Sequence, residues 1–100
     1  MSERPPDQAT ARELRTWAGL EDQQKWLRFE IITKEIARKM VANAPGLRWI
    51  DIDYRRRTEI AEEVNAKTVE EGIGAVKDGA IFWRMPKAIA SIKSAAEDTA

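Results

Sequence analysis

Hydrophobic residues recur with a helical period along much of this chain. The strongest repeat lies in residues 22–44, where large apolar side chains return every three or four positions: Trp26, Phe29, Ile32, Ile36 and Met40, with Leu27 and Ile31 beside them. The repeat stops at Ala44, because a residue that precedes proline is disfavoured in the helical region. The pattern predicts a long amphipathic helix over 22–44 that forms the spine of the fold.

A shorter helix is predicted before it, over residues 11–18. Thr10 and Glu13 have the spacing of a capping box, in which the hydroxyl accepts a backbone N–H of the first turn and the carboxylate reaches back. Gly19 suits the left-handed position that ends many helices. We therefore expect the chain to turn at Gly19 before the long helix begins.

Two more helices are predicted in the middle of the chain, with a tight turn between them. Asp53 can cap a helix over 54–64, and Asn65 suits the turn that follows. Thr68 and Glu71 repeat the capping-box spacing and open the second of these helices.

Two segments leave more than one structure open. Residues 47–54 are rich in β-branched and aromatic side chains, as in a short strand, but Trp49 and Ile50 are adjacent and break the alternation. Asp78-Gly79 is typical of a hairpin turn, although we favour a helix that ends with a glycine cap there. Pro86 then fits the first turn of a last helix.

These elements predict a mostly α-helical small domain of four or five helices, with a helix-turn-helix-like middle and one short strand pair left open. We expect a single helical domain over 10–95 and a frayed C-terminus over 96–100. Residues 1–9 are polar and contain a Pro-Pro pair, so we expect a disordered N-terminal tail. A chain of 100 residues with 43% hydrophobic content can form one core without a metal or a disulfide.

The chain contains no histidine and no cysteine, so the commonest metal ligands, general bases and soft nucleophiles are missing. Asp51 and Asp53 can share one side of an extended segment, but two carboxylates are fewer ligands than a magnesium ion requires. The sequence predicts a protein that is not an enzyme, with no catalytic residue, no metal and no cofactor.

Charged residues make up 34% of the chain, and no apolar run is long enough to span a bilayer. The start of the sequence also lacks the apolar stretch of a secretion signal. We therefore expect a cytoplasmic or nuclear protein that has no membrane partner.

Residues 55–77 resemble the middle of a helix-turn-helix unit. The resemblance rests on a helix with Ile60, Ala61 and Val64 inward, on the turn at Asn65, and on the newly capped helix after it. It implies a transcription-associated DNA-binding domain, of winged-helix type if the hairpin is present. The phosphate contacts would then come from basic residues, namely Arg55, Arg56, Arg57, Lys67, Lys77, Arg84 and Lys87.

Two observations weigh against DNA. The chain carries 17 basic and 17 acidic residues, and no segment of it is strongly basic. The second helix of the unit also begins with Glu70 and Glu71, where phosphates and base edges have to be approached. We therefore expect nucleic acid to be a less favoured partner than protein.

The densest apolar segment is Ala80–Pro86 (AIFWRMP). On a strand, the odd-numbered residues of this segment point outward and Phe82 points into the core. Exposed aromatic residues next to an arginine are typical anchors of protein interfaces. The predicted contact residues are therefore Ile81, Trp83, Arg84 and Met85, together with Trp26 on the long helix. The other interpretation is that the apolar residues of this segment all close the core over the long helix.

The leading hypothesis from the sequence is a non-catalytic helical module that binds another protein or itself. The alternative is the helix-turn-helix or winged-helix DNA-binding domain described above.

Overall fold

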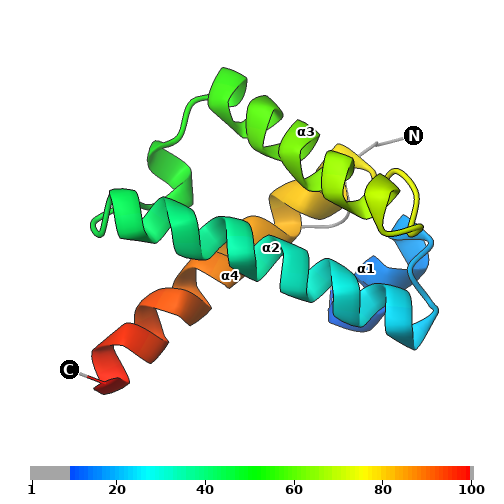
Figure 1. Ribbon diagram of the computed structural model, residues 1–100, viewed down its shortest axis with the longest axis horizontal. Coiled ribbons are helices and arrows are strands. Elements are labelled where there is room, and N and C mark those ends of the chain that lie inside the picture. Colours follow the sequence, from blue (N-terminus) through cyan, green and yellow to red (C-terminus); the bar gives the residue numbers. More distant parts are fainter. Residues whose placement is uncertain (1–9, 100) are drawn as a thin grey trace.

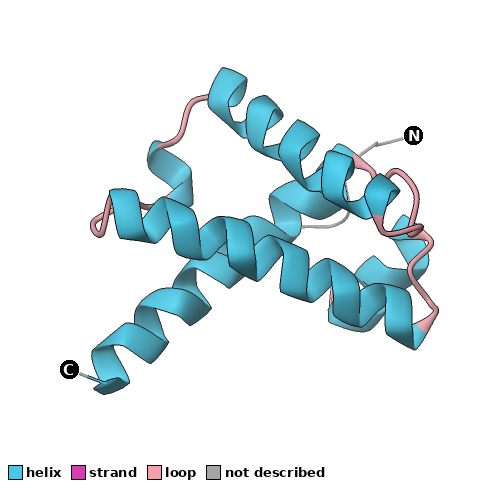
Figure 2. Cartoon of the chain, in the orientation of Figure 1, coloured by secondary structure: helices cyan, strands magenta, loops and turns pink. Residues whose placement is uncertain are grey.

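The computed structural model describes residues 10–99, and helices make up most of that range (Figure 2). In chain order the elements are α1 (Ala11–Ala18), α2 (Gln23–Asn43), the 3-10 turn η1 (Trp49–Asp51), α3 (Tyr54–Glu70) and α4 (Asp78–Thr99). The predicted mostly α-helical class is confirmed. No strand occurs in residues 10–99, so the strand pair that the sequence left open is absent from this range. The tail 1–9, for which the sequence predicts disorder, lies outside the described residues.

The first two helices follow their sequence signals. Thr10 Oγ1 accepts the backbone N–H of Glu13 at 3.2 Å, and Gly19 ends α1 with a φ of 74°. Asp22 caps α2, because its Oδ1 accepts two N–H groups of the first turn at 2.9 and 3.1 Å. Both predicted helices are therefore confirmed.

The segment between α2 and α3, for which the sequence left a short strand open, contains a helical turn. The Arg48 side chain spans η1 and donates from Nε to Asp51 Oδ2 at 2.9 Å. A strand needs a hydrogen-bonded neighbour, and no extended partner lies beside this segment in the described part of the chain. The turn contacts α4.

Helix α3 runs without a break from Tyr54 to Glu70, so the turn predicted at Asn65 is wrong. Asn65 lies inside the helix, and its Oδ1 accepts the backbone N–H of Val76 at 2.7 Å. Thr68 also lies inside α3. Its hydroxyl donates to the carbonyl of Asn65 at 3.1 Å and caps no new helix. The helix-turn-helix unit is therefore absent at the residues that predicted it.

Two glycines follow the end of α3. Gly72 and Gly74 have φ values of 81° and 92°, a region that glycine adopts without strain. These positive φ values turn the chain into the loop 71–77, which leads to α4. The sequence interpretation placed the same glycines inside a helix.

Helix α4 begins at Asp78 and continues through Pro86 to Thr99. The predicted glycine cap at Gly79, the alternative hairpin and the predicted helix start at Pro86 are all wrong. Proline inside a helix removes one backbone hydrogen bond and costs roughly 3 kcal/mol relative to alanine. Burial of the apolar residues on both sides of it offsets this cost. Fraying at 96–100 stays a prediction, since α4 extends into this segment and its last residue lies outside the described range.

Helix α2 lies at the centre of the packing. Figure 1 shows α3 running beside it and α4 crossing it, and α2 contacts both. The buried hydrophobic residues come from all four helices and from the loops beside them: Leu14, Leu20, Trp26, Phe29, Ile32, Ile36, Ala37, Ile60, Ala61, Val64, Val76, Ala80, Ile81, Met85, Ala88 and Ile89.

The hydrogen bond between Asn65 and Val76 ties the loop 71–77 to α3, and its removal is the first testable consequence. Replacing Asn65 with alanine is expected to lower the free energy of unfolding by about 1–2 kcal/mol, because the Val76 N–H loses its acceptor. Urea denaturation measures the loss, and amide hydrogen exchange follows Val76 itself. Glu62→Ala, at an exposed position of the same helix, is the control. Unchanged protection of the Val76 amide in Asn65→Ala would contradict this role.

Candidate functional site

The structure contradicts the outward stripe predicted for Ala80–Pro86. The segment is part of α4, where residues four positions apart share a face, so Ile81 and Met85 both enter the core and are fully buried. Arg84 is buried as well, with 8% of its surface exposed. Of the contact residues predicted in this segment, Trp83 alone keeps a partly exposed side chain.

The other predicted aromatic positions also differ from expectation. Trp26 is buried on α2, and the Arg15 guanidinium carbon of α1 lies 5.5 Å from its ring centroid. Phe82, predicted as a core residue, is only partly buried. Its ring instead packs against side chains of η1 and α3.

These contacts join Trp49, Tyr54 and Phe82, and we call this cluster, together with the exposed Ile50 that follows Trp49 in η1, the aromatic surface. The ring centroid of Phe82 lies 6.1 Å from that of Trp49 and 6.4 Å from that of Tyr54. Ile50 and Tyr54 are 76% and 70% exposed, more than the other exposed large hydrophobic residues of the described range. Three separate elements, η1, α3 and α4, therefore present apolar groups to solvent at one place.

Basic side chains surround the aromatic surface. Arg57 lies with its guanidinium carbon 5.2 Å from the Trp49 ring centroid, and its Nη2 donates to the Trp49 carbonyl at 3.0 Å. A hydrogen bond from Arg48 lowers the pKa of Asp51, and the charge of Lys93 on α4 adds to this effect. Residues 48–57 contain four arginines and two aspartates, so this segment carries a net positive charge, although Arg56 pairs with Glu59 outside it.

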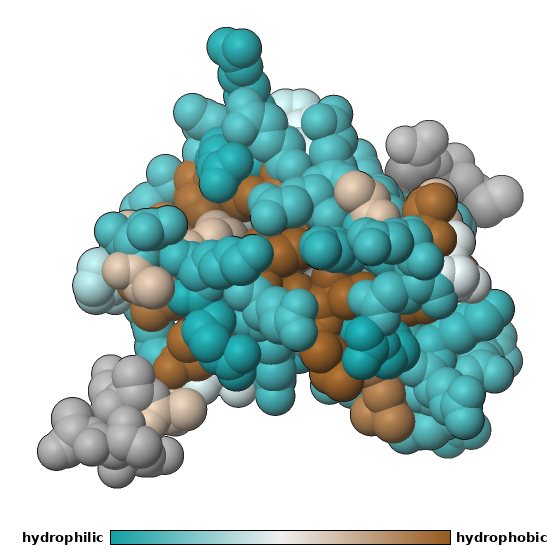
Figure 3. Space-filling model, viewed as in Figure 1, coloured by the Kyte–Doolittle hydropathy of each residue, from teal (hydrophilic) through white to brown (hydrophobic). Residues whose placement is uncertain are grey.

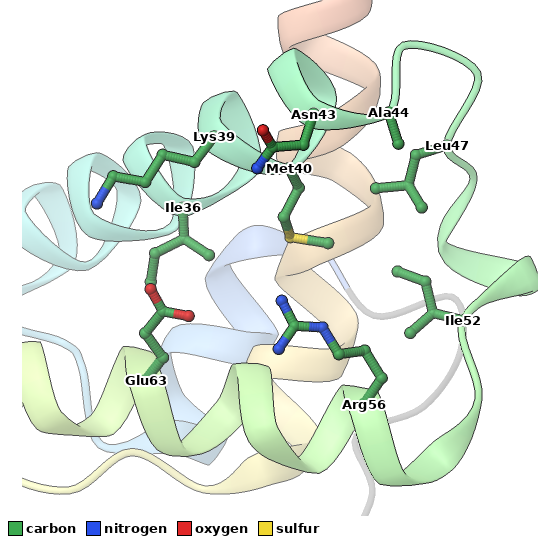
Figure 4. Close-up of a pocket in the computed structure, with 9 residues that line it drawn as sticks. All are labelled: Ile36, Lys39, Met40, Asn43, Ala44, Leu47, Ile52, Arg56 and Glu63. Carbon is green, nitrogen blue, oxygen red and sulfur yellow. The ribbon is translucent and has the colours of Figure 1, made fainter.

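A groove of about 360 Å³ opens between the C-terminal half of α2 and the N-terminal half of α3, and we call it the α2–α3 groove. Figure 4 shows the residues that line it: Ile36, Lys39, Met40, Asn43, Ala44, Leu47, Ile52, Arg56 and Glu63. Met40 points from α2 toward Arg56, and Leu47 and Ile52 reach in from the connecting segment. Apolar walls with a few charged groups among them suit an apolar side chain flanked by polar atoms.

The groove and the aromatic surface share one stretch of chain. Leu47 and Ile52 line the groove, while Ile50 and Tyr54 belong to the aromatic surface. Hydrophobic residues are also visible between the hydrophilic side chains that cover α2 and α3 (Figure 3). The connection between α2 and α3 therefore carries the main exposed apolar features that we identify in residues 10–99.

A cluster of polar residues lies where α4 crosses α2, and we call it the α2–α4 seam. Arg84 Nε donates to Thr33 Oγ1 at 3.1 Å, and its Nη2 lies 3.9 Å from Glu30 Oε2. Burial lowers the pKa of Arg84, and the charge of Glu30 partly opposes this shift. Lys87, one turn further along, places its ammonium 3.8 Å from the ring centroid of Trp83.

The basic residues predicted for DNA do not converge on one face. Arg56 pairs with Glu59 at 3.1 Å, and Lys77 lies 4.6 Å from the Trp17 ring centroid beside α1. The others divide into three groups. Arg55 and Lys67 are exposed at opposite ends of α3, Arg57 packs on Trp49, and Arg84 and Lys87 belong to the α2–α4 seam.

Sequence reasoning missed the residues that expose most apolar surface. Ile50 follows Trp49 directly, and two adjacent large apolar residues break the alternation expected of a strand. This break was the sequence signal that one of the two side chains points outward. Tyr54 gave no signal, because its exposure depends on where α3 begins relative to α4.

Within residues 10–99, no group of three or more acidic side chains is placed to hold a metal ion. No helix in that range has the length and apolar character needed to cross a membrane. Comparison with family models, curated proteins and solved structures found no match to this chain.

Proposed function

We propose that this chain is a non-catalytic helical module that binds another protein through the aromatic surface and the adjoining α2–α3 groove. The observation that carries the proposal is the exposure of Ile50 and Tyr54, at 76% and 70%, beside the partly buried rings of Trp49 and Phe82. Tyrosine and tryptophan are enriched among the residues that dominate binding energy at interfaces. Burying one large apolar side chain contributes roughly 1.5–3 kcal/mol.

The basic surroundings favour a different protein over a second copy of the same chain. In a two-fold symmetric dimer the same patch faces itself, so the net positive segment 48–57 would meet its own copy. Like charges across an interface are unfavourable, whereas opposite charges speed encounter and select the partner. The partner therefore presents an apolar anchor with acidic residues around it.

The α2–α3 groove gives such an anchor a place to insert. Its volume of about 360 Å³ lies at the lower end of the range of roughly 300–1,000 Å³ that is usual for ligand pockets. Ile36, Met40 and Leu47 supply apolar walls, and Lys39, Arg56 and Glu63 add charged groups to the lining. An aliphatic or aromatic side chain next to a carboxylate fits this lining.

DNA binding through a helix-turn-helix unit is the weaker proposal. Its turn was assigned to Asn65, which lies inside α3. Two arginines of the basic cluster at the start of α3 are engaged, Arg56 with Glu59 and Arg57 with Trp49. Arg55 remains exposed, and a single free arginine supplies little of the phosphate contact that such binding needs.

The experiment combines Ile50→Ser with Tyr54→Ala in one variant. Both side chains are exposed, so the variant is expected to keep the melting temperature of the original chain. The partner, first captured with the unchanged chain and then purified, is expected to bind the variant at least about 30-fold more weakly by calorimetry, which corresponds to a loss of roughly 2 kcal/mol.

Val69→Ser is the matched control, because Val69 is 58% exposed but lies at the far end of α3 from Tyr54. Equal affinity of the double variant and the control would contradict the proposal. Self-association in light scattering that the double variant abolishes would assign the surface to a second copy. Tight binding to duplex DNA at physiological salt would instead favour the helix-turn-helix alternative.

A further inference from the structure

The two methionines of residues 10–99, Met40 and Met85, differ in their access to solvent. Met85 is fully buried in the core. Met40 is partly exposed and lines the α2–α3 groove of about 360 Å³. Figure 4 shows its sulfur in the space between Leu47 and Arg56. A small solute that enters the groove therefore reaches the sulfur of Met40, whereas it reaches that of Met85 only when the core opens.

A thioether sulfur is a soft nucleophile that peroxides oxidise. The chain has no cysteine to compete for the oxidant. In the reaction the sulfur attacks one oxygen of a hydroperoxide and the O–O bond breaks. The sulfur loses two electrons and becomes a sulfoxide. The other oxygen takes the displaced proton and leaves as water from hydrogen peroxide, or as an alcohol from an organic hydroperoxide.

The groove offers a hydrogen-bond donor to the oxygen that this reaction adds. Met40 points toward Arg56, which reaches into the groove from α3 (Figure 4). Arg56 Nη1 donates to Glu59 at 3.1 Å. A guanidinium carries five N–H groups, so donors remain for a sulfoxide oxygen. A link between Met40 and Arg56 would join the two walls of the groove across its opening.

We propose that Met40 is a peroxide modification site that regulates the α2–α3 groove. A hydroperoxide converts Met40 to methionine sulfoxide, and the new oxygen accepts a hydrogen bond from Arg56. Oxidation changes a flexible apolar side chain into a polar one, and an apolar anchor leaves such a group without a partner. Methionine sulfoxide reductases reverse the change. The loss of binding rests on the proposed function, whereas the selective oxidation of Met40 does not.

The first test exposes the folded chain to hydrogen peroxide and follows the peptides that contain Met40 and Met85 by mass spectrometry. The Met40 peptide is expected to gain one oxygen at least about tenfold faster, because Met85 reacts only through opening of the core. The same treatment in denaturant is the control and is expected to remove the difference. Equal rates in the folded chain would overturn the proposal.

The second test detects the contact with Arg56 and separates it from simple exposure of the sulfur. The side-chain Nε–H signal of Arg56 is expected to shift in NMR spectra when Met40 is oxidised, and to return after treatment with the reductases. Peroxide is expected to cause no shift in Met40→Leu, a variant of similar volume that keeps the apolar wall. Arg55, exposed next to Arg56, gives the reference signal. An Arg56 signal that does not move when Met40 is fully oxidised would contradict the proposed link.

The third test measures binding of the purified partner from the experiment on Ile50 and Tyr54. The oxidised chain, and Met40→Gln without peroxide, are expected to bind it at least about tenfold more weakly, the effect of one unpaired polar group. Met40→Leu is expected to bind as the original chain does, before and after peroxide.

The outcomes separate this proposal from the proposed function. Unchanged binding by the variant at Ile50 and Tyr54 would refute the proposed function, while the peroxide and NMR results would still establish the modification of Met40. Loss of binding in that variant, together with full binding by the chain oxidised at Met40, would refute the regulation and leave the proposed function intact.

Discussion

Replacing Phe29 with alanine is expected to lower the free energy of unfolding by about 3–5 kcal/mol, the usual penalty for removing an aromatic ring from a core. Phe29 is fully buried, and its ring centroid lies 5.6 Å from that of Trp26. It stands on the helix that contacts both α3 and α4. Small domains have about 5–15 kcal/mol of stability in total, so this single change removes a large part of it. Urea unfolding followed by tryptophan fluorescence measures the loss.

Leu27→Ala on the same helix is the control. Leu27 is 46% exposed and lies on the outer side of α2, so its truncation is expected to change the stability by no more than about 0.5 kcal/mol. Similar losses from Phe29→Ala and Leu27→Ala would mean that the buried face of α2 is assigned incorrectly.

Replacing Met85 with alanine is expected to cost about 2–5 kcal/mol, because the side chain is fully buried on the same face of α4 as Ile81. The size of this effect distinguishes a helix from a strand in this segment. On a strand, Met85 would share the outward face with Trp83, and its loss would be nearly neutral. Chemical denaturation followed by circular dichroism gives the value.

Ser94→Ala provides the control for α4, since Ser94 is exposed on the same helix and is expected to be neutral. A stability loss for Met85→Ala no larger than that of Ser94→Ala would restore the outward orientation that the sequence pattern favoured.

The sequence predicted α1 and α2 correctly because local signals and the hydrophobic period agree there. Thr10 and Asp22 cap helices whose apolar residues recur on one face, and Gly19 supplies the turn between them. In such segments the backbone hydrogen bonds and the burial of one face favour the same conformation. Tertiary contacts then favour the same helices as the local sequence does.

The later helices could not be read in this way because tertiary contacts overrule their local signals. Thr68 and Glu71 have the spacing of a cap, but Thr68 is fully buried inside α3. Pro86 is typical of a first helical turn, yet it lies within α4. In both cases the gain from burying the helix in the core exceeds the local preference, and the sequence carries no measure of that gain.

The candidate sites were partly visible in the sequence. Arg84 was named as a contact residue, but its burial against Thr33 depends on the crossing of two helices that are distant in sequence. Ile81 and Met85 were assigned outward because the segment was taken as a strand. In a helix, side chains repeat on one face every 3.6 residues instead of every two, and with this period both residues enter the core.

The contact between α2 and α4, which is the most extensive between any two elements of the described chain, has a consequence for synthesis on the ribosome. Thr33 and Arg84, which meet in it, are 51 positions apart in the sequence. At roughly 5–20 residues per second, α2 leaves the ribosome about 3–10 s before the residues that cover it. During that interval the part of the apolar face of α2 that α4 covers is open to chaperones and to neighbouring nascent chains, whereas α1, which contacts Trp26, and α3 leave the ribosome before α4 does.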